Sequence, residues 1–483
     1  MDFPMIPTSA ETVTQDWIAR VVADEFKTEP TNLLIKNWNI TAGALRTDGF
    51  MSRMQRISVT ARRKKMDAND TEGDPKSEQK FSLLAKLYPP GELHKKLVRK
   101  MRVFEREIHV LHDYTNLVLE QQVVEPKIRP SFAKLFFQEI GLEASCLVME
   151  DLKEIGFRMN DKRLGMDLAH ATLCVRAEAV HAATGFNAKQ RMGIEQYLLR
   201  NAPLVVEVYD KNFGQIMDVQ IFPGTIAFAK SQNRPDLVQR LEDYVKKVKS
   251  PFARFMAGVL RFGELAVMSH GDCWNNNYMF RYEKNEEGKD VPVEVKILDL
   301  QISRFSHITG DLASVLLANV PNKVRENCLN HLLLEYYVTF MSTVEKMETP
   351  WPNRAAYTFD AFLKDMESAW EMGFLISSWL LPMILSNDEE LPNFDDIKDD
   401  RVEDLFEDHV DKMSRGDQAH KSSVDLFQRF TSVKLDPDAN FAVTENPKHW
   451  NFKLNFKIQY IHPTGDSAAS IILFTRKFSS SNP

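Results

Sequence analysis

The sequence lacks most features that mark secreted, membrane or metal-cluster proteins. Its 483 residues include only 4 cysteines, which lie far apart without a Cys-x-x-Cys pair, so we expect neither a disulfide framework nor a zinc site. The first residues have neither a basic start nor an apolar stretch of signal-peptide length, which favours a cytoplasmic protein. The longest apolar stretch, residues 373–385, contains two serines and a proline and is too short to span a bilayer of about 30 Å. It predicts a buried helix.

An excess of positive charge is also missing. The formal net charge is -7, so the chain has no general attraction to phosphate backbones, and the short basic run at 62–65 is better explained as the solvated end of a strand. We therefore expect neither a nucleic-acid partner nor a membrane. With 43% hydrophobic and 27% charged residues, the composition is that of a globular protein large enough for more than one core.

The first 149 residues predict a small antiparallel sheet followed by one helix. Residues 56–62 and 81–90 have strand-like patterns, and the polar segment 66–80 between them predicts an exposed loop. From Glu92 to Leu119, apolar residues recur every three or four positions, which predicts a single helix.

Beyond residue 150 the pattern becomes mainly helical. Residues 167–185 predict a helix that stops at Gly185. Segments 265–282 and 291–301 are exceptions and predict short strands around a polar turn. Aromatic and methionine residues at helical spacing in 359–382 fit core packing and the wall of a substrate pocket equally well. The organisation is thus α+β, with a first lobe at 1–149, a mostly helical second lobe at 150–430, and a tail at 431–483 of uncertain fold.

The segments 265–282 and 291–301 carry residues suited to phosphoryl transfer. That reaction needs a carboxylate to receive the proton of the nucleophile and oxygen ligands to hold Mg²⁺ on nucleotide phosphates. Asp272 is the candidate base, and Asn277, five positions later, is a candidate Mg²⁺ ligand. A second carboxylate, Asp299, follows at the end of the next apolar run. A lone His-x-Asp often only holds a turn together, but these three residues at this spacing favour a kinase site.

A kinase site also requires a lysine on a strand of the first lobe and a glutamate on the helix that follows. Lys86 lies within an otherwise apolar strand, where a charge is conspicuous, and Glu107 lies in the predicted helix. Either residue alone is an ordinary surface charge. The expected cofactors are ATP and Mg²⁺.

Several motifs together resemble the insect ecdysteroid kinase-like family, which belongs with choline kinase-like and aminoglycoside phosphotransferase-like enzymes. They are LVMEDL (147–152), HGDCWNNNYMF (270–280), ILDLQ (297–301) and GDLA (310–313). The resemblance covers residues from about 30 to about 420 and implies a two-lobed protein-kinase-like fold. It also implies a hinge whose backbone groups meet adenine, formed by Glu150, Asp151 and Leu152, and it gives the base and the metal ligands the roles stated above.

The loop that covers the nucleotide phosphates departs from the pattern of this family. The family tends to have glycine, two polar residues, an aromatic residue, any residue, and serine. Here the segment 46–52 keeps Phe50 and Ser52 but has its glycine at Gly49. A nearby glycine still permits close approach of the backbone to a phosphate. The resemblance therefore implies that Ser52 contacts the nucleotide.

The acceptor has several candidates. A protein kinase is disfavoured, because Gly271 stands where protein kinases usually have arginine, and only twelve positions separate Asp299 from Asp311, too few for a regulated activation segment. Choline needs aromatic residues and a carboxylate around its ammonium group, whereas an ecdysteroid needs a wide apolar pocket. The resemblance implies a hydroxyl acceptor that is bulky and apolar, an ecdysteroid or a xenobiotic. A choline or aminoglycoside-type kinase and a catalytically inactive nucleotide-binding protein are the alternatives.

Overall fold

The computed structural model describes residues 6–43, 51–64, 78–141, 143–209 and 233–385, with isolated positions between 210 and 232. The chain divides into two units, 1–434 and 435–483, and all described residues belong to the first. Gly49 and Phe50 of the predicted phosphate loop lie outside the described residues, as do 66–77 of the predicted exposed loop and the tail at 431–483.

The first lobe is built on a five-stranded antiparallel sheet with the order β1-β2-β3-β5-β4. Its strands are β1 (Leu33–Ala42), β2 (Arg53–Arg63), β3 (Gln79–Leu87), β4 (Leu135–Ile140) and β5 (Ser145–Glu150). The predicted antiparallel pair is β2 with β3, although β3 begins at Gln79, so the end of the predicted loop belongs to the strand.

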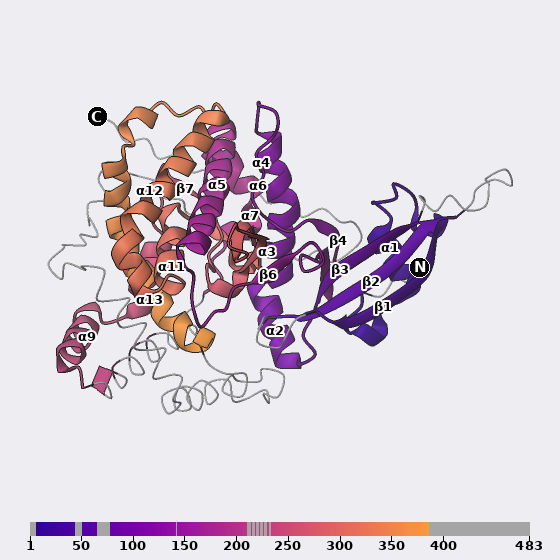
Figure 1. The fold of residues 1–483 in the computed structure, drawn as a ribbon, viewed down its shortest axis with the longest axis horizontal. Helices are drawn as coiled ribbons and strands as arrows, with labels where there is room; N and C mark the ends of the chain where they lie inside the picture. Colours follow the sequence, from indigo (N-terminus) through magenta and orange to yellow (C-terminus); the bar gives the residue numbers. More distant parts are fainter. Residues whose placement is uncertain are drawn as a thin grey trace, which may run out of the picture. The chain divides into compact units, whose positions relative to one another are not determined.

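Helix α1 (Gln15–Val22) covers one face of this sheet (Figure 1). Ile57, Val59 and Ala61 alternate along β2 and are buried in the same cluster as Trp17 and Val22 of α1. The alternation of strand side chains therefore determines which face of the sheet receives the helix. Short 3₁₀ turns, Ala10–Thr12 and Pro30–Asn32, flank α1.

The prediction of one unbroken helix from Glu92 to Leu119 is wrong, because the structure breaks it into several helical segments. The structure has α2 (Glu92–Met101), α3 (Val103–His109), a π-helical turn (Val110–Tyr114) and α4 (Thr115–Glu120). The break lies at Arg102, which has left-handed backbone angles of φ 54° and ψ 42°. Val98 before the break and Phe104 after it enter the same core, so the apolar spacing continues across it. Periodicity alone could not reveal the break.

The second lobe is mainly helical, as predicted. Its helices are α5 (Leu168–Met192), α6 (Ile194–Arg200), α7 (Ala202–Val205), α9 (Pro235–Val248), α10 (Pro251–Val259), α11 (Thr309–Ala318), α12 (Asn322–Lys346) and α13 (Phe359–Leu385). In Figure 1, α5 lies beside α12, and α11 lies beside α13.

Short strands and turns interrupt these helices. Strands β6 (Phe157–Met159), β8 (Tyr278–Lys284) and β9 (Asp290–Ile297) form one antiparallel sheet, while β7 (Ala266–Ser269) pairs with β10 (Arg304–His307). The 3₁₀ turns are Asn275–Asn277, Leu300–Ile302 and Arg354–Ala356. The two strand-like segments predicted from sequence are thus present as β7, β8 and β9, whereas β10 was not foreseen.

Helix α5 continues past its predicted stop at Gly185 and ends before Gly193, which has φ +82°. Gly185 lies inside the helix, at a position that two tyrosine side chains approach closely. A Cβ atom there would lie 2.4 Å from the hydroxyl oxygen of Tyr114 and 3.2 Å from that of Tyr197. This glycine therefore permits close packing and does not end the helix.

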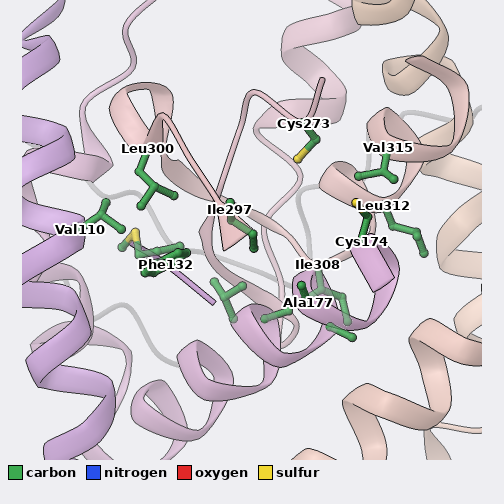
Figure 2. Packing of buried hydrophobic residues seen from close by; sticks show 14 of the residues in the cluster. Val110, Phe132, Cys174, Ala177, Cys273, Ile297, Leu300, Ile308, Leu312 and Val315 are labelled. Carbon is green, nitrogen blue, oxygen red and sulfur yellow. The ribbon is translucent and has the colours of Figure 1, made fainter. Parts of the chain in front are cut away.

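A smaller, separate cluster of buried side chains lies in the second lobe, and the largest core combines residues of both lobes. Figure 2 shows Phe132, Ile297 and Leu300 in one part of this core, and Cys273 with Leu312 in another. Ile297 and Leu300 lie on either side of Asp299, and Cys273 follows Asp272. The chemically interesting segments are therefore anchored in the core by their immediate neighbours.

The aromatic and methionine residues of 359–382 belong to α13, where core packing accounts for most of them. Phe362 and Met366 are each 1% exposed, and the ring of Phe362 stacks on that of Tyr336 with centroids 5.8 Å apart. Phe374 is also buried. These three side chains pack in the interior. Among the described residues, no helix has the length and apolar character needed to cross a membrane.

Candidate active site

Lys86, on β3, is the centre of a buried ion cluster. Its Nζ atom lies 2.5 Å from Glu107 Oε2 on α3 and 2.9 Å from Asp299 Oδ1, just after β9. Gln301 Oε1 lies 3.3 Å from the same nitrogen. Lys86 is 4% exposed and Glu107 is 1% exposed. The fold thus brings together three residues that sequence analysis assigned to one site from distant parts of the chain.

The charges of this cluster stabilise one another against the cost of burial. Burial by itself disfavours the ammonium of Lys86, but the neighbouring carboxylates of Asp299 and Glu107 outweigh it and raise the pKa of Lys86. Burial raises the pKa of Glu107, and the charge of Lys86 opposes this rise. One lysine thus faces two carboxyl groups, which leaves the cluster with an excess of negative charge when both are ionised.

Asp299 has an unusual backbone conformation. Strand β9 ends at Ile297, and Asp299 takes left-handed angles of φ 57° and ψ 62° before the turn at Leu300–Ile302. Such angles are rare outside glycine and persist where the surrounding structure imposes them. Here one carboxylate oxygen pairs with Lys86, while the side chain stays 22% exposed. Asp299 can therefore pair with the lysine and still meet a ligand.

Asp272 and Asn277 lie on the loop between β7 and β8. The Asn277 amide donates to the Asp272 carboxylate at 3.0 Å and to the Asp272 backbone carbonyl at 2.8 Å. The 3₁₀ turn at Asn275–Asn277 folds the chain back and so makes a spacing of five residues a direct contact. Asp272 is half-buried, and loss of hydration together with the charge of Asp299 raises its pKa to about 6. A carboxylate with such a pKa suits a general base near neutral pH.

Asp311, at the start of α11, anchors this loop. Its carboxylate accepts hydrogen bonds from the backbone N–H groups of His270 at 2.7 Å and Gly271 at 2.9 Å. Gly271 has φ +83°, and a Cβ atom there would lie 2.6 Å from the carbonyl oxygen of Ile302. Sequence analysis used Asp311 only to measure spacing and missed this role. The GDLA motif was the available signal.

His270 orients the loop from inside the core. It is fully buried, with Nε2 2.9 Å from the Leu298 carbonyl and Nδ1 3.3 Å from the Cys273 sulfur. Glu178 of α5 accepts a hydrogen bond from the Tyr278 hydroxyl at 2.7 Å and lies 3.6 Å from His270 Nδ1. Burial lowers the pKa of His270, but Glu178 more than offsets this, and the result is a pKa of about 9. Glu178 was not identified from sequence.

The three hinge residues implied by the resemblance lie at the end of β5. The carboxylate of Asp151 pairs with Arg56 at 2.5 Å and accepts from the Ser82 hydroxyl at 2.8 Å. The backbone N–H of Asp151 donates to the Ser82 carbonyl, and the Leu152 carbonyl accepts from the N–H of Phe157. The N–H of Glu150 donates to the carbonyl of Lys134. Several backbone groups of this segment thus already form hydrogen bonds within the chain. An adenine would have to bind through the other backbone groups of the segment.

Ser52 immediately precedes β2. Two residues later, Met54 pairs across the sheet with Lys86, so Ser52 lies at the same end of the sheet as the lysine. The Ser52 hydroxyl lies 3.8 Å from the sulfur of Met54.

Similar proteins are found among solved structures and among known families. No curated protein matches the chain significantly. Among solved structures, a microcompartment-associated aminopropanol kinase is 10% identical over 86% of this chain and 97% of its own, with a TM-score of 0.34. An aminoglycoside phosphotransferase from Streptomyces rimosus, in complex with ADP and streptomycin, is 13% identical over 60% of this chain and 89% of its own, with a TM-score of 0.27.

The model of the ecdysteroid kinase-like family matches residues 46–349. This range holds the ion cluster around Lys86, the loop with Asp272 and its anchor Asp311. The chain therefore belongs to the ecdysteroid kinase-like family, and it is a phosphotransferase that acts on hydroxyl groups of small molecules.

Proposed function

We propose that the protein transfers the γ-phosphoryl group of ATP, with Mg²⁺, to a hydroxyl group of a bulky and largely apolar small molecule. The observation that carries the proposal is the contact of Lys86 with both Glu107 and Asp299. In kinases, a lysine held by a glutamate of the neighbouring helix positions the nucleotide phosphates, and a nearby carboxylate holds the metal. An inactive relative is expected to have lost such groups, and here they are present and in contact.

The oxygen ligands near Asp299 suit Mg²⁺. Asp299 offers a carboxylate and Asn277 an amide oxygen, and hard oxygen ligands of this kind are the ones that Mg²⁺ takes in proteins. The N–H of Leu298, next to Asp299, donates to the backbone carbonyl of Asn277 at 2.9 Å, so the two proposed ligands lie on adjoining segments. When bound, Mg²⁺ neutralises charge on the phosphate oxygens. Asn277 and Asp299 are the residues that hold it in this proposal.

Asp272 is the proposed base. The oxygen of the acceptor hydroxyl attacks the γ-phosphorus, and its proton passes to the Asp272 carboxylate. The bond between the γ-phosphorus and the oxygen that bridges to the β-phosphate breaks, and ADP leaves with that electron pair. Asn277 orients the Asp272 carboxylate through its amide hydrogen bond, and Lys86 binds phosphate oxygens. A pKa of about 6 keeps Asp272 ionised at neutral pH and still basic enough to accept the proton.

The acceptor class rests mainly on the family. The segment between Asp299 and Asp311 is occupied by the turn at Leu300–Ile302, by β10 and by the start of α11. It therefore holds no long activation segment, which supports a small molecule over a protein substrate. We propose an ecdysteroid or a xenobiotic, because the chain belongs to the ecdysteroid kinase-like family.

The direct test is incubation of the pure protein with labelled ATP, Mg²⁺ and a panel of ecdysteroids, phenolic glycosides and choline. We expect a single phosphate on one hydroxyl of a multi-ring compound, located by mass spectrometry and formed only when ATP and Mg²⁺ are both present. Phosphorylation of choline alone would overturn the acceptor class and leave the kinase assignment intact. Absence of Mg²⁺-dependent ATP binding would overturn the proposal as a whole.

A further inference from the structure

Arg106 lies next to Glu107 on α3 and makes a separate set of contacts. Its side chain is 2% exposed, and within the described part of the chain it donates to four backbone carbonyls. Nε donates to the carbonyl of Gln301 at 3.2 Å, and a terminal nitrogen donates to the carbonyl of Ser303. The other terminal nitrogen donates to the carbonyls of Pro203 at 2.7 Å and Val206 at 2.9 Å.

The guanidinium stays charged in this environment. Burial, followed by the nearby charge of Arg304, lowers the pKa of Arg106 to about 10, which is still well above neutral pH. Burying a charged group costs free energy unless its hydrogen-bond donors have acceptors. Four backbone carbonyls accept from the guanidinium of Arg106. Because the guanidinium is planar and its donors have fixed directions, these contacts require the carbonyls to keep defined positions. Arg106 therefore fixes the relative placement of the segments that it joins.

One of these segments directly follows Asp299 of the candidate site. Gln301 and Ser303 belong to the turn and short link directly after Asp299, whereas Pro203 and Val206 belong to α7 and the residue that follows it. One turn further along α3, His109 Nε2 lies 3.1 Å from the side-chain oxygen of the buried Asn201. Helix α3 is thus attached by two successive turns to the second lobe.

We propose that Arg106 is the positioning residue that holds Glu107, and through it Lys86, in register with Asp299; the inference rests on the proposed function. Neighbouring residues on a helix point in different directions, so α3 presents Glu107 to Lys86 and Arg106 to the carbonyls after Asp299. In kinases, the position of this helix controls whether the lysine and glutamate pair. Here the helix is fastened to the chain segment that carries Asp299, so the ion pair and the metal ligand are positioned together.

The kinetic test uses Arg106→Met and Arg106→Lys, with Arg325→Met as the matched control. Arg325 is 1% exposed on α12 and likewise donates to backbone carbonyls, those of Leu316 and Val320. The rate measured is release of labelled phosphate from Mg²⁺ATP with water as acceptor. We expect a loss of roughly 10- to 100-fold for Arg106→Met, since small misplacements of reacting groups have effects of this size. Arg106→Lys should lose less, and Arg325→Met should change the rate little.

Combination with Glu107→Gln separates positioning from general destabilisation. If Arg106 acts through Glu107, adding Arg106→Met to Glu107→Gln lowers the rate little further, whereas Arg325→Met contributes its own factor independently. Full multiplication of the Arg106 and Glu107 effects, or a loss in Arg325→Met equal to that in Arg106→Met, would overturn the inference.

Hydrogen exchange provides a readout that does not depend on activity. In Arg106→Met, or in Arg106→Lys if the methionine variant does not fold, the amides of 103–109 and 300–303 should exchange faster than in the wild type. The same amides should be unchanged in Arg325→Met. Unchanged exchange in the Arg106 variants refutes the positioning role. If the wild type neither binds nor hydrolyses Mg²⁺ATP, the proposed function fails, and the exchange result still decides whether Arg106 holds α3.

Discussion

Lys86→Met is the perturbation whose consequences the structure defines most fully. Methionine keeps much of the length of the lysine side chain and removes the charge that faces Glu107 and Asp299. The Glu107 side chain is 2% exposed, so water cannot replace the lysine. Loss of one partner from a buried ion pair costs about 3–5 kcal/mol. We expect Lys86→Met to lower the free energy of unfolding by about this amount near pH 8.

Glu107→Gln should have a smaller effect. Lys86 then keeps Asp299 at 2.9 Å and Gln301 at 3.3 Å as partners, so no buried charge is left unpaired. The double variant, Lys86→Met with Glu107→Gln, no longer buries an unpaired charge at position 107, and the Asp299 side chain, which also loses the lysine, is 22% exposed and can be hydrated. It should therefore be more stable than Lys86→Met alone, with an interaction free energy of about 1–3 kcal/mol.

The effect of Lys86→Met should depend on pH. Burial and the charge of Asp299 both raise the pKa of Glu107, and Lys86→Met removes the positive charge that opposes this rise. A carboxyl group whose pKa is higher in the folded than in the unfolded state binds a proton more tightly when folded. The destabilisation is therefore largest above the folded pKa and shrinks as the pH falls towards the unfolded value of about 4.3.

Urea unfolding measures the free energies of unfolding, and from them the interaction free energy and its dependence on pH. The wild type, both single variants and the double variant are compared near pH 8 and near pH 5. Phosphate release from Mg²⁺ATP by the same four proteins gives the catalytic cycle. Additive effects on stability and on rate would show that Lys86 and Glu107 do not act as a pair. Equal destabilisation by Lys86→Met at both pH values would refute the buried, unpaired carboxylate as its cause.

Further predictions concern the loop and the metal ligand. Asp272→Asn should lower turnover by orders of magnitude and leave ATP affinity nearly unchanged, and equal loss of binding in titration calorimetry would exclude its role as base. With a pKa of about 6 for Asp272, turnover should fall about tenfold from about pH 7 to about pH 5, and a flat profile contradicts the assignment. Asp299→Ala should weaken Mg²⁺-dependent nucleotide binding as well as turnover, and an unchanged Mg²⁺ requirement would make Asp299 structural. Gly271→Ala should reduce turnover and thermal stability, because its Cβ would lie 2.6 Å from the Ile302 carbonyl; wild-type behaviour would show that the loop adapts.

Short-range patterns were the most predictable part of this protein. Alternation identified β2 and β3, and the spacing from Asp272 to Asn277 is short enough for one turn to make it a contact. Lys86 was conspicuous because an apolar strand surrounds it, and its partners followed from the needs of phosphoryl transfer. In each case the signal lies in neighbouring residues or in the chemistry of the residue itself.

Positions that depend on distant packing were not predictable in the same way. The break at Arg102 is hidden because the residues on both sides enter one core, and Gly185 is explained by the hydroxyl groups of Tyr114 and Tyr197. The aromatic pattern of α13 fits core packing and a pocket wall equally well, and only the stacking of Phe362 on Tyr336 shows that Phe362 packs in the core.

The sequence by itself determined the lobes, the strand pairing around Lys86 and the chemical types at the site, because periodicity, composition and motif spacing are properties of neighbouring residues. Only the tertiary structure decided how α3 is held against the segment after Asp299. That attachment runs from the Arg106 guanidinium to four backbone carbonyls far away in sequence. Every residue, proline included, has a backbone carbonyl that can accept a hydrogen bond, whatever its side chain. No sequence pattern therefore marks the residues that accept from Arg106.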